Sequence, residues 1–152
     1  MSEFEIVRSA DIQADPARVR ALVDDFHEWT AWSPWEDVDP ALQRTYSGPD
    51  SGVGAHYAWA GNRRAGEGSM EIVSSTPEEI GIRLAFLKPW KGTNDVTFTF
   101  LPRGAATEVT WRMNGEHKGM AALFGKVFNM DKLIGRDFEK GLTRLKAVAE
   151  TS

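Results

Sequence analysis

The chain has 152 residues, no cysteine and a formal net charge of −4. The lack of cysteine excludes disulfides, thiolate catalysis and cysteine-based metal sites. The acidic balance argues against nucleic-acid binding, because that affinity depends on basic residues that meet phosphates.

The N-terminal residues 1–5 are acidic and contain no apolar segment of the kind that a signal peptide requires. No apolar run approaches the roughly 20 residues that a membrane span needs. We therefore expect a cytoplasmic protein, and the length predicts one domain over residues 1–152.

The first predicted elements are a strand followed by two short helices. Residues 4–13 alternate between apolar and polar side chains, with Arg8 on the apolar side, which indicates a half-buried strand. Asp15-Pro16 then predicts a helix start, since Asp can cap and Pro suits the first helical position. An apolar stripe at helical spacing continues to Trp32, and Ser33-Pro34 ends it.

The middle of the chain predicts six short strands. Their alternation is clearest over residues 80–86, where every second residue is Ile, Leu or Phe. Tight turns rich in Gly, Pro, Asn and Asp separate neighbouring strands, which is typical of an antiparallel meander. The six strands are expected at residues 42–46, 53–60, 66–74, 80–86, 96–100 and 109–113.

The last part of the chain, residues 117–150, predicts a long helix with one apolar face. Glycine weakens helix interiors, so a break is expected near Gly125 or Gly135. A sheet with one apolar face needs a cover, and this helix is the only predicted element long enough to supply it. Because a curved sheet cannot touch a straight helix along its whole length, we expect an apolar cavity between them.

Short motifs spread over nearly the whole chain support this order of elements. They are Trp32-Ser33-Pro34-Trp35, Gly52-Val53-Gly54-Ala55, Trp59-Ala60-Gly61-Asn62, Gly66-Glu67-Gly68, Lys88-Pro89-Trp90, Thr107-Glu108-Val109-Thr110-Trp111 and Phe138-Glu139-Lys140-Gly141-Leu142.

Together these motifs resemble the START/Bet v 1-like (SRPBCC) superfamily and, within it, the bacterial polyketide cyclase/dehydratase-like group. The resemblance implies an α+β helix-grip fold, in which a seven-stranded curved antiparallel sheet wraps around a long C-terminal helix. It also implies a ligand cavity, but no fixed set of catalytic residues, and fold alone does not imply function.

The candidate ligand-binding residues are large rings and thioethers expected to face the cavity. The alternative for each of them is an ordinary packed core, where such residues are usually buried. Trp32 and Trp35, which flank the Ser-Pro break, either gate the cavity mouth or seal the short helices against the sheet. The inward set consists of Tyr57, Trp59, Met70, Phe86, Phe98, Trp111, Met113, Phe124 and Phe128.

Candidates for acid–base chemistry are few. Asp131 falls within the apolar stripe of the last helix, so it is either a cavity carboxyl with a raised pKa or the cap of a restarted helix. Tyr57 is the one tyrosine predicted to face inward. Arg64, like Arg8, could hold a ligand carboxylate or simply face solvent.

No metal site or cofactor is predicted. His27, His56 and His117 lie far apart in the sequence and match no known metal-ligand spacing. The Gly66-Glu67-Gly68 stretch is not followed by a predicted helix, so it is not a phosphate-binding loop.

Three functions fit these features. The first is binding of a small hydrophobic, ring-containing or lipid-like molecule in the internal cavity. The second is a cyclase/dehydratase-like enzyme that uses the same cavity to hold a flexible substrate. The third is a protein-interaction module like the chaperone-activating relatives of the fold, which would have a filled interior and an exposed apolar surface patch. The sequence is compatible with either a monomer or a homodimer.

Overall fold

The computed structural model describes residues 3–35, 39–62, 66–88, 91–116 and 130–151. None of the helices in these ranges combines the length and the apolar content needed to cross a bilayer. The elements, in chain order, are β1 (Glu3–Ile12), α1 (Pro16–Val23), the 3-10 helix η1 (Glu28–Ala31), β2 (Gln43–Ser47), β3 (His56–Ala60), β4 (Glu67–Ser75), β5 (Glu79–Lys88), β6 (Gly92–Arg103), β7 (Ala106–Glu116) and α3 (Met130–Glu150).

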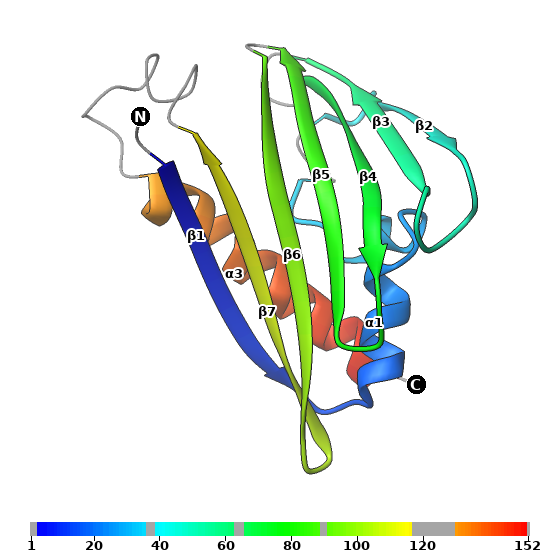
Figure 1. Ribbon diagram of the computed structural model, residues 1–152, viewed down its shortest axis with the longest axis vertical. Helices are drawn as coiled ribbons and strands as arrows, with labels where there is room; N and C mark the ends of the chain where they lie inside the picture. The colour runs from blue at the N-terminus through cyan, green and yellow to red at the C-terminus, as the bar shows by residue number, and fades with distance from the viewer. Residues whose placement is uncertain (1–2, 36–38, 63–65, 89–90, 117–129, 152) are drawn as a thin grey trace.

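The strands form one seven-stranded antiparallel sheet in the order β1-β7-β6-β5-β4-β3-β2. Strands β2 to β7 follow one another as a meander, and β1 pairs with β7. Figure 1 shows α3 crossing behind β1, β7 and β6, while β2 and β3 lie at the opposite edge of the sheet. The predicted helix-grip architecture is therefore confirmed, with the second of the two short helices formed as a 3-10 turn.

Two register shifts in the pairing of β4 with β5 contribute to the curvature. They lie between Glu67 and Gly68 and between Ile72 and Ser74. Such irregularities bend a strand and increase its local twist. The half of the sheet formed by β2 to β5 consequently leaves the path of the straight helix.

The segment from α1 to η1 is fixed by two buried indoles. Nε1 of Trp29 donates a hydrogen bond to the carbonyl of Val23, and Nε1 of Trp32 donates to the carbonyl of Leu22, both at 2.9 Å. Both rings are buried, so these bonds satisfy donors that would otherwise be costly to desolvate. They hold the chain after α1 against the apolar face of the sheet.

The connection between α1 and the sheet is also polar. The buried carboxylate of Asp24 accepts a hydrogen bond from Oγ of Ser75 on β4 at 2.9 Å. Nε of Arg20 donates to the carbonyl of Thr76 at 2.8 Å. These bonds fasten α1 to the end of β4.

Helix α3 packs its apolar stripe, which includes Phe138, Leu142 and Leu145, into the core. It runs unbroken across Gly135, so of the two positions expected for a break this one is excluded. Tertiary packing of the stripe outweighs the roughly 1 kcal/mol that glycine costs within a helix. Gly125 lies outside the described residues.

The predicted strand over residues 53–60 begins later than expected, at His56. Gly52 and Gly54 have φ angles of 78° and 97°, which L-residues rarely adopt. The amide of Gly54 donates to the carbonyl of Ile72 at 2.9 Å. Residues 52–55 therefore form a tight turn that still contacts β4.

Candidate functional site

The concave side of the sheet contains a hollow of about 240 Å³, which we call the central pocket. It lies over the part of the sheet that α3 does not cover closely. Its described lining residues are Phe26, Trp29, Thr30, Ser33, Trp35, Leu42, Tyr46, Tyr57, Trp59, Met70, Leu84, Phe86, Val96, Trp111, Met113, Ile134, Asp137 and Phe138.

The sheet side of the pocket is built from residues in register. Tyr46, Tyr57, Met70 and Leu84 are successive partners across β2, β3, β4 and β5. The period of two along each strand directs all four side chains to the same face. The rings of Tyr46 and Tyr57 also contact each other, with centroids 5.2 Å apart.

The next row across the sheet contains Trp59, Gly68 and Phe86, again in register. Gly68 leaves room for the indole of Trp59 to lie over β4. A Cβ atom at this position would be 2.6 Å from Cη2 of Trp59 and 2.5 Å from the carbonyl oxygen of Ala85. The absence of a side chain at Gly68 therefore sets where the Trp59 ring rests.

The opposite side of the pocket comes from the chain around η1 and from one face of α3. Trp35 makes edge-to-face contacts with Trp111 and Phe138, at centroid distances of 5.8 Å and 6.3 Å. Ile134, Asp137 and Phe138 project from successive positions on one helical face. Rings thus surround the hollow on several sides, as expected for a site that binds apolar ligands.

Two indole N–H groups lie at this wall, one on Trp35 and one on Trp111. Nε1 of Trp35 donates a long hydrogen bond of 3.3 Å to Oδ2 of Asp137. Among the described residues, Nε1 of the buried Trp111 has no hydrogen-bond partner. Leaving such a donor unsatisfied costs about 1–3 kcal/mol, so Trp111 is held in place by its ring contacts and not by its N–H group.

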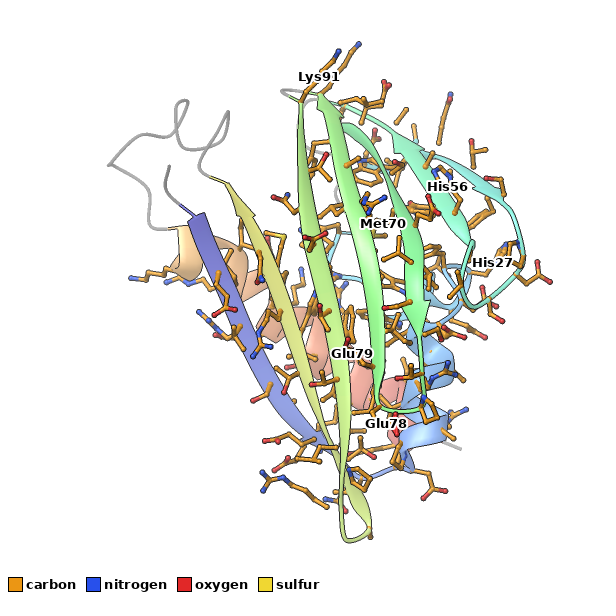
Figure 2. The ribbon with its side chains drawn as sticks, viewed as in Figure 1. His27, His56, Met70, Glu78, Glu79 and Lys91 are labelled. Carbon is orange, nitrogen blue, oxygen red and sulfur yellow. The ribbon has the colours of Figure 1, made fainter. Side chains whose placement is uncertain are left out.

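A smaller hollow of about 150 Å³ adjoins the central pocket, and Phe26 and Tyr46 line both. Its lining also includes His27 and His56, which lie on the side of the molecule formed by β2 and β3 (Figure 2). Nδ1 of His27 lies 2.8 Å from Oδ1 of Asp25, and the imidazole stacks on Tyr46 with centroids 4.0 Å apart. Within the described ranges, no three His, Asp or Glu side chains are grouped so that they could hold a metal ion.

The sequence model of a family described as polyketide cyclase / dehydrase and lipid transport matches residues 3–150. The chain belongs to this family. The match confirms the resemblance to the START/Bet v 1-like (SRPBCC) superfamily that the sequence motifs indicated. No curated protein is significantly similar to the chain.

Several solved structures are similar to this chain over almost its whole length. A protein of Chromobacterium violaceum shares 16% identity with a TM-score of 0.69, covering 97% of this chain and 98% of the other. The Aha1 protein of Colwellia psychrerythraea, solved as a dimer, also has 16% identity and a TM-score of 0.69, with 97% of both chains covered. Major latex-like protein 151 of Panax ginseng has 12% identity and a TM-score of 0.68, covering 97% and 98%. At these identities the similarity establishes the fold alone.

The predicted ligand-binding residues fall into three groups in this member of the polyketide cyclase / dehydrase and lipid transport family. Trp32 and Phe98 are fully buried and do not line the central pocket: Trp32 lies beside Trp29, and Phe98 stacks on Trp111. Phe124, Phe128 and Arg64 lie outside the described residues. The residues that line the pocket are Trp35, Tyr57, Trp59, Met70, Phe86, Trp111 and Met113.

Two charged candidates are placed as follows. Asp131 is the second residue of α3 as described, and its side chain lies outside the described part of the structure. Arg8 points from β1 towards α3, where Nε donates to Oε2 of Glu139 at 2.8 Å. Arg8 does not line the pocket.

Sequence reasoning missed Tyr46 and Asp137 as pocket residues. For Asp137 a signal was present, because it lies three residues after Ile134 and one before Phe138, within the apolar face of the last helix. Tyr46 lay at the end of a strand whose partners were unknown. Its inward position depends on its pairing with Tyr57.

Proposed function

We propose that the protein binds a small hydrophobic, ring-containing or lipid-like molecule in the central pocket. The observation that carries this proposal is a hollow of about 240 Å³ surrounded by aromatic and aliphatic side chains. Such pockets, apolar with a few polar groups, are typical of small-molecule sites. Membership of a family described as including lipid transport supports the same reading.

A ligand panel tests this proposal. Fatty acids, sterols and polycyclic aromatic compounds would be added to the purified protein, with tryptophan fluorescence and melting temperature as readouts. Trp29, Trp35, Trp59 and Trp111 line the pocket, so an occupant should change their emission. Binding to the folded state should also raise the melting temperature, and the rise should grow with the logarithm of ligand concentration above the dissociation constant. If no compound changes either quantity, and no molecule co-purifies in native mass spectrometry, the proposal is wrong.

A second candidate function is catalysis of a cyclisation or dehydration in the same pocket, which the family description also names. The described lining offers Tyr46, Tyr57 and Asp137 as groups that could move a proton. Asp131 and Arg64 remain predicted contributors. The test needs a substrate that the protein converts. If Tyr57→Phe and Asp137→Asn convert it at the wild-type rate, these two residues do not transfer the proton.

The interaction-module alternative receives less support. That function calls for a filled interior, whereas the central pocket is hollow. One structural neighbour is an Aha1 protein solved as a dimer, at 16% identity. We propose that the protein is a monomer or a homodimer, and light scattering of the purified protein would measure which. A cytoplasmic location is likewise a proposal.

A further inference from the structure

We infer that the central pocket selects hydrophobic molecules that carry a protonated nitrogen, with Asp137 as the counter-ion. The inference rests on the proposed function and narrows it to a ligand class. Of the described residues that line the pocket, Asp137 is the only one with a formal charge. This carboxylate therefore favours a ligand whose head group carries a positive charge.

Asp137 has no cationic partner among the described residues. Its one hydrogen bond there is from Nε1 of Trp35, and at 3.3 Å this bond is long. The carboxylate is half-buried between Trp35 and the pocket. The guanidinium of Arg144, about two helical turns further along α3, donates to the carbonyl of Ser33 at 3.0 Å and does not line the pocket. A carboxylate in this setting has unused acceptor capacity that a ligand N–H group can fill.

The rings beside Asp137 favour the same kind of ligand. Trp35 adjoins Asp137 through the hydrogen bond, and Trp111 and Phe138 contact Trp35. An ammonium group that pairs with Asp137 would therefore leave the apolar part of the ligand in contact with these rings.

An anionic ligand lacks these advantages. No lysine or arginine of the described residues lines the pocket, and the chain carries a net charge of −4. A ligand carboxylate near Asp137 would be repelled, with no compensating cation among the described lining residues. A neutral ligand avoids the repulsion but supplies no positive charge to pair with the Asp137 carboxylate, whose hydrogen bond within the described residues is from Nε1 of Trp35.

Three probes with one ring system and different head groups test the inference. They are 2-naphthylmethylammonium, 2-naphthylmethanol and 2-naphthoate, measured by isothermal titration calorimetry at neutral pH and low salt. We expect the ammonium to bind about tenfold more tightly than the alcohol, as for a hydrogen bond to a charged group, and the carboxylate to bind most weakly.

The variant Asp137→Asn keeps an oxygen that can accept from Trp35 but removes the charge. In this variant the ratio of the ammonium affinity to the alcohol affinity should fall to about twofold or less. Glu139→Gln is the matched control, because Glu139 lies on α3, is exposed, pairs with Arg8 and does not line the pocket. That variant should retain the full ratio, and melting curves would verify that both variants are folded.

The outcomes separate this inference from the proposal on which it rests. If the alcohol binds and the ammonium binds no more tightly, the assignment of Asp137 is overturned while hydrophobic binding stands. A preference for the ammonium that persists in Asp137→Asn overturns it as well. If none of the probes and no member of the wider panel binds, the proposed function fails and the inference fails with it.

Discussion

The indole ring of Trp111 on β7 lies parallel to the phenyl ring of Phe138 on α3, with centroids 4.1 Å apart and planes inclined by 6°. On its other side, Trp111 stacks on Phe98 at 4.8 Å. Cζ3 of the same indole would be 2.8 Å from a Cβ atom at Gly141, so the helix approaches the sheet closely there. This contact fixes one end of the pocket, and it supports the first prediction.

Phe138→Ala should lower the free energy of unfolding by about 3–5 kcal/mol, because it removes a buried ring and leaves a cavity beside Trp111. Urea denaturation followed by circular dichroism measures the change. Lys140→Ala on the exposed face of α3 is the control, and it should change stability by less than about 0.5 kcal/mol. A loss below about 1 kcal/mol in Phe138→Ala would show that the stacking does not join helix and sheet as described.

Leu84→Trp should abolish ligand binding without unfolding the protein, because the larger side chain would occupy the central pocket that Leu84 lines. Calorimetric titration with whichever panel compound binds best measures the effect. Leu101→Trp is the matched control, since Leu101 is 52% exposed on β6 and does not line the pocket. Equal loss of binding in both variants, or normal binding in Leu84→Trp, would contradict the location of the site.

Gly135→Ala should change the stability of the protein through two effects of opposite sign. Alanine favours the helix by about 1 kcal/mol over glycine. Its Cβ atom, however, would lie 2.5 Å from Cζ of Arg8 and displace the guanidinium from Glu139. We therefore expect a small net change in the wild-type background.

In an Arg8→Ala background the displaced group is gone, so Gly135→Ala should be more stabilising there, by about 0.5–1 kcal/mol relative to its effect in the wild type. Thermal and chemical denaturation of the four proteins complete the double-mutant cycle. Additive effects would mean that Arg8 does not rest against the helix at Gly135.

Glu150 should titrate below the ordinary range of a glutamate. Nζ of Lys146 donates to Oε2 of Glu150 at 2.6 Å, and the amide of Gln13 donates to the same oxygen at 2.8 Å. The Lys146 hydrogen bond and then the Gln13 hydrogen bond lower the pKa of Glu150. Since both bonds favour the charged carboxylate, their contribution to stability is present above the unfolded-state pKa and is lost as pH falls through the lowered folded-state pKa.

Carbon-detected NMR titration of the Glu150 carboxyl measures this pKa. Lys146→Met should raise it towards the usual value while leaving the Gln13 bond in place. An unchanged pKa in that variant would show that the Lys146 hydrogen bond is not the main cause.

Much of the fold could be predicted because alternation and turns are local signals. The strand β5 could be predicted from the alternation of Ile80, Ile82 and Leu84. The turns before and after it could be predicted from their turn-forming residues. The start of β3 at His56 could not be predicted from alternation, because the conformations of Gly52 and Gly54 depend on a contact with Ile72 far along the chain. Continuity of α3 through Gly135 likewise depends on packing against β1 and not on helix propensity.

The pocket was predictable in outline and less so in composition. Strand phase directed Tyr57, Trp59 and Met70 to the correct face, and the structure brings them together at the central pocket. Phase alone could not distinguish Phe98, which packs behind Trp111, from Met113, which reaches the hollow. That distinction depends on which part of the sheet the helices cover, and this is a property of the assembled molecule.

The missing side chain at Gly68 has a consequence for how the protein could change over evolutionary time. A side chain at position 68 would meet the indole of Trp59 and, at 2.5 Å, the backbone carbonyl oxygen of Ala85, so a larger residue there would have to shift β5 as well as the ring. Glycine at a position that contributes no side chain to the pocket is therefore a condition for the present place of the Trp59 ring. Related chains that keep this ring in the same place should keep glycine at position 68, even where the residues that contact the ligand differ.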